Sequence, residues 1–522
     1  MDLIISNLRI AVERDGIDEY LSAASQALNV GVQALSFVKI LSKSIDARNK
    51  RQFFYEIAVV VGVPDDFANP AGLPVYVERP RPARTLRAPV DRPIVVGFGP
   101  AGIFAALELI EYGLKPIIFE RGKRIEKRSR DVLRFIKERA LDPESNIQFG
   151  EGGAGSYSDG KLFSRIKNSE YIDRVLDTFI RFGAPEEIGY MSKPHLGTDV
   201  LCRIVRNMRE HILERGGEIH YNSRMTDIII SDGAARGVVI NRGEEFRSSS
   251  IFLALGHSSR DTFEMLHARG VVIEQKPISV GVRVEHPAEV INLIRYGEKY
   301  KAYSKIGAAT YSFSCNDRKL GRGIYTFCMC PGGEVVNASS EEGMLVVNGM
   351  SYSARASAFS NSAIIVTCNT ADYGSDAPLA GLEFQRTIER KAFDAAGGTW
   401  QAPAQNLTDF LDNKVSNNLN RNSFAMGVAS VDMTGLFPAF VNTALKAAFN
   451  SWKEAYPLFV SHHAALIGPE TRTSAPIRLK RDERYESVNV KNLIPIGEGS
   501  GYTGGITSSA ADAIKAVEAR MG

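Results

Sequence analysis

The sequence predicts an α/β protein that combines a parallel sheet and a β-meander with an inserted mixed α+β domain and a small N-terminal α/β domain. Three observations support this prediction. A glycine-rich stretch, Gly97-Phe98-Gly99-Pro100-Ala101-Gly102, stands between an apolar run and a segment with helical periodicity. Three apolar runs of strand length end in glycine or acidic residues: 93–96 before Gly97, 115–119 before Glu120, and 492–496 before Gly497 and Glu498. The long chain between the second and third runs leaves room for an inserted domain.

The stretch 97–102 fits the dinucleotide-binding pattern G-x-G-x-x-G, in the strand-turn-helix context that this pattern requires. Gly97 permits the tight turn, Gly99 lets the backbone approach a pyrophosphate, and Gly102 lets the helix pack close to the strand. Pro100 and Ala101 begin the helix, whose N-terminus presents free N–H groups to the phosphates. We therefore predict a Rossmann-like FAD/NAD(P)-binding fold; the alternative is a glycine-rich turn that binds nothing.

Glu120 stands at the tip of the second predicted strand, where its carboxylate can accept hydrogen bonds from an adenosine ribose. A carboxylate there would repel a 2′-phosphate, which favours FAD or NAD over NADP. We include the adjacent Arg121 among the predicted cofactor-binding residues. The charged segment 123–139 is predicted as a helix, and because its basic side chains recur on several sides we expect them to form a solvated face.

The chain of 522 residues is long enough for two or three domains with sizeable cores. The net charge of +3 does not indicate a nucleic-acid or membrane partner. We find no transmembrane run and no secretory signal, and the five cysteines suit free thiols, so we expect a cytoplasmic protein. We predict an N-terminal domain with a proline-rich linker at 1–90, a cofactor domain in two parts at 91–262 and 484–522, and an inserted substrate or cap domain at 263–483.

The N-terminal domain has a basic cluster at 42–51. It lies between the second and third of the strands predicted here, which are 8–12, 35–41 and 53–61, with a helix at 18–28. The cluster can be interpreted as a contact for RNA or a phosphate, or as a solvated hairpin, and we favour the hairpin.

A second glycine-rich loop spans 149–162 and cannot be the interior of a regular element. Such a loop offers backbone N–H groups to a phosphate or to a flat ring held close; the alternative is a flexible surface loop. Thr198 is predicted as the N-cap of a helix at 200–215, and the nearby His195 is either catalytic or structural. The residues of this loop predicted to bind the cofactor are Gly152, Gly153, Ala154, Gly155, Ser158, Asp159, Lys161 and Leu162.

Two further strands are predicted to end at the cofactor. The buried strand 250–255 ends at Gly256, where the chain can pass close to a ligand. The strand 492–496 leads to Gly497 and Glu498, and the carboxylate of Glu498 can accept hydrogen bonds from ribityl hydroxyls. The helix 507–519 follows, and its N-terminal residues Gly504, Gly505 and Ile506 are predicted to face the flavin edge. Strands at 218–221, 225–230, 237–240 and 244–247 predict the β-meander; the insert is predicted to hold strands at 278–284, 324–328, 343–348 and 363–368, and helices at 382–396 and 438–454.

Three of these elements resemble the FAD domain of glutathione-reductase-type flavoproteins: 97–102 with Glu120, 253–256, and Gly497 with Glu498. Further stretches are similar to the large bacterial FAD-dependent dehydrogenases, also described as NAD(FAD)-utilising dehydrogenases. The resemblance covers nearly the whole chain and implies the fold and non-covalent FAD, but hardly the reaction. Leu255 stands where the wider pattern has threonine. The similar stretches are 44–48, 149–162, 193–198, 255–261, 325–333, 348–351, 468–472 and 497–512.

We expect an FAD-dependent oxidoreductase that acts on an unidentified organic substrate, with NAD(P)H as a candidate transient electron donor because no second glycine motif is present. Cys328 and Cys330 form a C-x-C pair that points both thiols to one side of a strand; they can protonate substrate, shuttle electrons or merely pack. Arg472 either binds a substrate carboxylate or forms a salt bridge between domains. No metal site is predicted.

A second hypothesis is a non-catalytic or RNA-linked flavoprotein. In this hypothesis the N-terminal basic domain binds RNA, and FAD is structural or a redox sensor. The near-neutral net charge of +3 and the large insert favour the enzyme.

Overall fold

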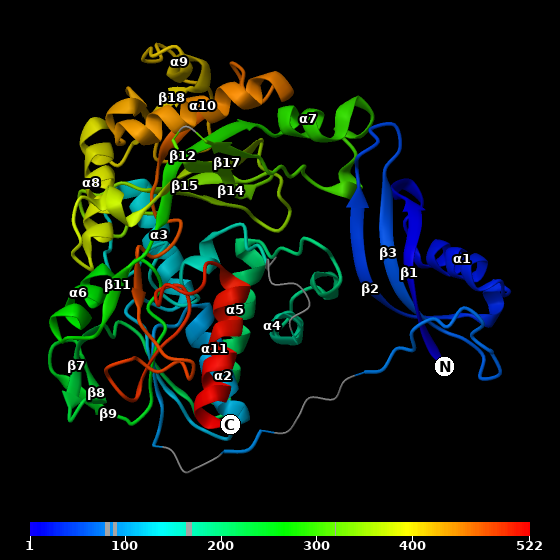
Figure 1. Cartoon of the computed structure of the whole chain (residues 1–522), viewed down its shortest axis with the longest axis horizontal. Coiled ribbons are helices and arrows are strands. Elements are labelled where there is room, and N and C mark those ends of the chain that lie inside the picture. Colours follow the sequence, from blue (N-terminus) through cyan, green and yellow to red (C-terminus); the bar gives the residue numbers. More distant parts are fainter. Residues whose placement is uncertain (79–83, 87–90, 163–169, 319) are drawn as a thin grey trace.

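The computed structural model describes residues 1–78, 84–86, 91–162, 170–318 and 320–522 (Figure 1). It confirms a mixed α/β protein with a parallel sheet. This sheet has the strand order β22-β10-β4-β5-β6. Its strands are β4 (Ile94–Val96), β5 (Ile117–Phe119), β6 (Glu218–His220), β10 (Ile251–Leu253) and β22 (Leu493–Pro495). The glycine turn follows β4, the central strand.

Side chains of β4 alternate between two cores, as expected for a strand buried on both faces. Val95 packs with helices on one face, including α2 (Pro100–Glu111), α5 (Thr198–Glu214) and α11 (Ile506–Met521). Ile94 and Val96 pack on the other face with α6 (Arg260–Ala268) and the meander. The meander consists of β7 (Met225–Ser231), β8 (Ala234–Ile240) and β9 (Glu244–Arg247). Two further helices of the cofactor domain are α3 (Ile125–Glu138) and α4 (Glu170–Arg181).

A seven-stranded sheet of order β13-β14-β17-β12-β20-β18-β19 forms the body of the insert. Its strands are β12 (Ile278–Pro287), β13 (Ser314–Asp317), β14 (Arg322–Cys330), β17 (Phe359–Cys368), β18 (Ala402–Asn406), β19 (Val428–Ser430) and β20 (Ala465–Glu470). Helices α7 (Ala288–Tyr300), α8 (Ala380–Ala395), α9 (Leu407–Leu411) and α10 (Ala439–Ala455) surround it. Two short ladders pair β11 (Ile273–Gln275) with β21 (Ile477–Leu479), and β15 (Glu334–Asn337) with β16 (Val347–Met350).

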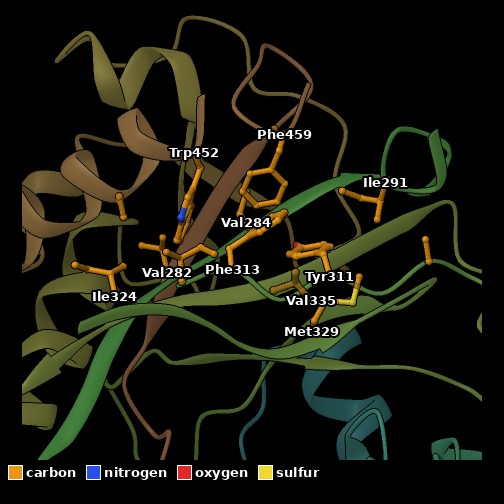
Figure 2. Close-up of a cluster of buried hydrophobic side chains, with 14 of the residues drawn as sticks. Val282, Val284, Ile291, Tyr311, Phe313, Ile324, Met329, Val335, Trp452 and Phe459 are labelled. Atoms are coloured by element: carbon orange, nitrogen blue, oxygen red, sulfur yellow. The ribbon is translucent and has the colours of Figure 1, made fainter. Parts of the chain in front are cut away.

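The core of the insert lies on the face of this sheet covered by α10. Figure 2 shows Trp452 of α10 and Phe459 above Val282, Val284 and Phe313. Met329 of β14 points into the same core. Because side chains alternate along a strand, the residues on either side of Met329 face the opposite direction, toward the cofactor domain.

The N-terminal domain is a three-stranded antiparallel sheet of order β1-β3-β2 with one helix. Its elements are β1 (Asp2–Ala11), α1 (Ile17–Leu28), β2 (Ser36–Asp46) and β3 (Phe54–Gly62). It stands beside the insert in Figure 1 and contacts it where Phe53 stacks on Tyr300 of α7, with ring centroids 4.1 Å apart. β1 and β2 are longer than predicted, and half of the basic cluster continues β2.

Several local predictions differ from the structure. Thr198 is the first residue of α5, and Gly197 is its N-cap; the Thr198 hydroxyl instead donates to the carbonyl of Ser158 at 3.2 Å. The strand predicted at 343–348 lies at β16, shifted toward the C-terminus. The sequence analysis did not predict α4, α6 or α7. No helix among the described residues is long and apolar enough to cross a membrane.

Candidate cofactor site

One cavity of about 370 Å³ runs along the carboxyl ends of the parallel strands and continues to the insert. This is the edge where α/β sheets bind their ligands. One end is lined by Glu120, Arg121 and Ser223, which follow β5 and β6. The other end is lined by the second glycine loop, the start of α11 and the insert. The cavity therefore joins segments that lie up to four hundred residues apart in the chain.

The turn after β4 is built so that only glycine fits at two positions. Gly97 has φ +100°, and a Cβ there would lie 2.4 Å from the carbonyl oxygen of Ala254. A Cβ on Gly102 would lie 1.9 Å from the carbonyl oxygen of Gly97. A Cβ on Gly99 would meet the Cα of Gly153 at 3.5 Å, so the two glycine loops are in close contact on the cavity wall. The glycines thus form a cradle of bare backbone that suits a pyrophosphate.

The carboxylate of Glu120 is buried and joins the backbone of both glycine loops at this end of the cavity. Its Oε2 accepts from the backbone N–H of Phe98 at 2.8 Å, and its Oε1 accepts from Gly122 at 2.8 Å and from Gly150 at 2.9 Å. A carboxylate has about four acceptor positions, so these three hydrogen bonds leave capacity for a ribose hydroxyl. Glu120 therefore joins the first turn to the second glycine loop and remains suited to the predicted role.

The expectation of a solvated basic face on α3 is wrong for Arg128. This side chain has no exposed surface, and its guanidinium donates to backbone carbonyls in the second glycine loop and just before it. The four shortest bonds go to the carbonyl oxygens of Asn146 (2.8 Å), Ile147 (2.8 Å), Glu151 (2.7 Å) and Gly153 (3.0 Å), and a fifth goes to Gly150 at 3.3 Å. Charge-assisted hydrogen bonds from a planar guanidinium hold a loop that has no regular structure of its own. A signal was present in the sequence, because Arg128 shares the helix face of Ile125, Val132 and Phe135.

Most residues predicted to bind the cofactor line the cavity. They are Gly97, Gly99, Pro100, Ala101, Glu120, Arg121, Gly153, Ala154, Gly155, Ser158, Asp159, Lys161, Gly256, Glu498, Gly504, Gly505 and Ile506. Gly102, Gly152, Leu162 and Gly497 lie behind its wall. Gly152 packs against Ser156, and Gly497 against Ala101, so these glycines support the lining backbone.

Cys328 and Cys330 both line the insert end of the cavity. A β-bulge between Phe327 and Cys330 gives Cys328 a left-handed backbone with φ +41°. Burial among protein atoms raises the pKa of the Cys328 thiol to about 12 and also raises that of Cys330. Both thiols are therefore protonated at neutral pH, which suits packing or proton donation better than nucleophilic attack.

Arg472 forms a salt bridge within the insert, and it is Arg260 of α6 that pairs with the same carboxylate from the cofactor domain. Its Nη2 and Nε lie 2.9 and 3.1 Å from the two carboxylate oxygens of Glu389 in α8, and its Nη1 donates to Ser340 at 2.6 Å. The same carboxylate pairs with Arg260 of α6, with Nη2–Oε1 at 2.8 Å. Arg472 lines the cavity, but its guanidinium is directed at Glu389, so substrate binding is not its role in this geometry.

His195 is not part of the cavity lining. It lies beside Lys161, with which it forms an isolated β-bridge, and burial lowers its pKa to about 4. The neutral imidazole has no charge to offer a ligand at physiological pH. The geometry agrees with the structural interpretation of this histidine.

Sequence reasoning missed several cavity residues. Asn348 and Glu470 lie in stretches singled out by the family resemblance, but nothing in their local pattern marked them as lining residues. Ser223 follows β6 and shows no motif at all. The missed lining residues with polar side chains are Gln148, Ser223, Arg224, His257, Ser258, Ser259, Thr262, Asn348, Glu470, Thr473 and Ser509.

Two family matches cover the domains just described. Residues 277–473 match the family "FAD-dependent protein, C-terminal domain-like", which coincides with the seven-stranded sheet and its helices. Residues 2–62 match "Domain of unknown function (DUF8436)", which coincides with the N-terminal sheet.

Two curated proteins are similar in sequence. A protein of Clostridium beijerinckii described as "Uncharacterized protein" is 42% identical over 527 aligned residues, which cover 99% of this chain and 98% of that protein. A Methylomonas 4,4'-diapophytoene desaturase (4,4'-diapolycopene-forming) is 43% identical over only 53 residues, 10% of each chain.

Among solved structures, the 3-ketosteroid-delta4-(5alpha)-dehydrogenase from Rhodococcus jostii RHA1 is 11% identical, with 83% of this chain and 97% of that chain covered and a TM-score of 0.34. A likeness of this size carries no argument about the reaction.

Proposed function

The chain belongs to the family of the Clostridium beijerinckii protein and carries the C-terminal domain of FAD-dependent proteins, and on that premise we propose that it is an FAD-dependent oxidoreductase acting on a small organic substrate. The observation that carries the proposal is the cavity that joins the glycine turn and Glu120 to the insert. A dinucleotide that places its ribose at Glu120 and its pyrophosphate at α2 extends toward the insert. The substrate is then held between the ring end of the cofactor and the insert.

The residues present fit FAD. The bare backbone at Gly97–Gly102 accommodates a pyrophosphate at the N-terminus of α2, and Glu120 retains an acceptor position for a ribose hydroxyl. Glu498 supplies a second carboxylate for ribityl hydroxyls, and the N-terminus of α11 directs its dipole at the ring end. When bound, FAD supplies two-electron redox chemistry at the ring end of the cavity.

The side chains of the protein hold the cavity walls in place, orient the substrate and exclude water from the site. Arg128 fixes the loop that forms one wall, and Glu389 with its two arginines fixes the insert against the cofactor domain. Cys328, a protonated thiol that is exposed to the cavity, is placed to hold a proton at the substrate end. Closing such a site from solvent strengthens its electrostatic interactions.

The visible absorption spectrum of the purified protein tests the proposal directly. We expect a flavin spectrum in the visible range, and bleaching of that spectrum on anaerobic addition of NADH, NADPH or an organic donor. A colourless protein that cannot be reconstituted with FAD contradicts the proposal. A flavin that no donor reduces would leave FAD as a structural group and contradict the enzyme.

We propose no nucleic-acid partner. In the basic cluster at 42–51, Lys43 pairs with Asp15 at 2.6 Å, Arg48 pairs with Asp46 at 2.7 Å, and Lys50 donates to the carbonyl of Ile294. These side chains are engaged within the chain, which supports a hairpin that contacts the insert. A gel shift on tRNA at low salt would contradict this part of the proposal.

A further inference from the structure

The insert end of the cavity carries one positive charge in excess. Arg283 pairs with Glu470 through Nε–Oε2 at 2.5 Å and Nη2–Oε1 at 3.1 Å, so these two charges balance. Asp159 is shared by two cations, with Arg355 Nη2 at 2.6 Å and Lys161 Nζ at 2.9 Å. Three cations thus face two carboxylates.

The uncompensated charge reaches the cavity at Lys161. The Lys161 side chain is 37% exposed and lines the cavity, whereas the Asp159 side chain beside it is 3% exposed and Arg283 is fully buried. An ammonium group has three donors, and within the described chain it bonds to Asp159 and to the carbonyl of Met329, which leaves one donor for a ligand.

Neighbouring groups at this end do not cancel the charge. The thiols of Cys328 and Cys330 are protonated, since burial raises the pKa of each. The ammonium of Lys161 lies 2.9 Å from the carboxylate of Asp159, and this ion pair favours its charged form. Arg472 and Arg260 are matched by the two carboxylates of Glu389 and Glu341.

A second donor stands on the same wall. The side-chain oxygen of Asn348 accepts from Arg283 Nη2 at 2.9 Å and from the N–H of Gly349 at 2.7 Å. Because the amide group is planar, its NH₂ points away from these partners, and no acceptor for it is found among the described residues. An ammonium and an amide NH₂ beside an aromatic ring, Phe327, match a carboxylate attached to an apolar body.

We infer that the substrate of this enzyme is an organic carboxylate, and that Lys161 is the residue that binds its carboxylate group. The inference rests on the proposed function, because the ring end of FAD locates the substrate beside the insert. Lys161 then determines specificity through charge: an anionic group neutralises the excess charge, while the matching neutral amide leaves it unbalanced.

The test titrates the FAD-loaded protein with a panel of small carboxylates (acetate, phenylacetate and benzoate) and with the amide of each, and follows the visible flavin spectrum. We expect at least one carboxylate to perturb the spectrum saturably, at least about tenfold more tightly than its amide, as the loss of a charge-assisted hydrogen bond predicts. Lys161→Met should weaken that binding about tenfold or more, and Lys161→Arg should largely restore it. Lys453→Met, on the exposed face of α10, is the matched control and should bind like the unchanged protein.

Three outcomes overturn the inference while the proposed function stands. If amides bind as tightly as carboxylates, or if no carboxylate perturbs the spectrum, the substrate class is wrong. If Lys161→Met binds carboxylates unchanged, Lys161 is not the residue that binds them. If chloride produces the same saturable change, the site binds inorganic anions and not organic carboxylates. If Lys161→Met does not retain FAD, the substrate class is decided by comparing the binding of each carboxylate and its amide to the unchanged protein. A protein without a flavin spectrum contradicts the proposed function itself.

Discussion

Arg260 of α6 and Glu389 of α8 form a bidentate ion pair, with Nη2–Oε1 at 2.8 Å and Nη1–Oε2 at 3.0 Å, in which neither side chain is more than 1% exposed. Arg472 reaches the same carboxylate from the other side. Because α6 belongs to the cofactor domain and α8 to the insert, the Arg260–Glu389 pair joins the two domains, while Arg472 pairs with the same carboxylate from within the insert. Its arginine neighbours hold the pKa of Glu389 well below its usual range, although burial opposes them.

Glu389→Gln removes the carboxylate partner of the buried Arg472 and leaves the buried Arg260 paired with Glu341 alone. We expect a loss of about 3–5 kcal/mol of unfolding free energy, as measured for other broken buried pairs. Urea unfolding, followed by intrinsic fluorescence, measures this loss of unfolding free energy. The exposed Glu383, one and a half turns earlier on α8, is the control, and Glu383→Gln should change stability by less than about 1 kcal/mol. Equal effects of the two changes would mean that the buried pair is unimportant.

Gly102→Ala should abolish retention of FAD. The added Cβ would lie 1.9 Å from the backbone oxygen of Gly97, so the turn must move away from the position that accommodates a pyrophosphate. The flavin absorbance per mole of purified protein measures the loss. Gly243→Ala provides the control, since a Cβ there meets nothing within 4 Å and Gly243 lies in an exposed turn. A yellow Gly102→Ala protein with normal flavin content would show that this glycine is not required.

Arg128→Met should loosen the second glycine loop. Four buried carbonyl groups lose their donor, which we expect to cost about 3 kcal/mol or more and to weaken FAD binding. The change in flavin affinity on reconstitution with FAD and the change in unfolding free energy are the two measurements. Arg130→Met, on the exposed face of the same helix, should leave both unchanged. Tight FAD binding by Arg128→Met would contradict the role given to this arginine.

The raised pKa of Glu285 in β12 predicts that the free energy of unfolding depends on pH. Burial raises its pKa to about 7, although it accepts hydrogen bonds from the hydroxyl and the N–H of Ser423. Because the carboxyl group holds its proton more tightly in the folded state than in the unfolded state, protonation stabilises the folded protein. This stabilisation is complete below the ordinary pKa of 4.5 and is lost as the pH rises through about 7. Glu285→Gln should therefore gain, relative to the unchanged protein, about 3 kcal/mol between pH 4 and pH 8. Urea unfolding at the two pH values measures this gain, and Glu342→Gln, an exposed substitution, should show none.

The sequence allowed the cofactor end of the site to be predicted because the requirements there are local. Gly97 and Gly102 are imposed by the turn itself, and Glu120 follows its strand directly, so a short stretch contains the evidence. Secondary structure of the α2 and α11 regions could be predicted for the same reason. The domain boundaries and the roles of the candidate catalytic residues remain predictions.

The other end could not be predicted because its contacts join remote segments. Glu389 stands in a strongly charged helix, where a charged residue usually lies in solvent. Only its distant partners, the guanidinium groups of Arg260 and Arg472, make its burial favourable. The excess charge at Lys161 likewise depends on Arg355, nearly two hundred residues away, and no local pattern reveals such a pairing.

The strand order of the parallel sheet has a consequence for biosynthesis. β22 pairs with β10 at the edge of the sheet, and α11 packs on α2, so the cofactor domain uses elements from both sides of the insert. A ribosome delivers β12 to β20 before it delivers either of these last elements. The insert can therefore fold while the nucleotide-binding half is still incomplete, and the nascent protein gains its cofactor only in the final moments of translation or after release.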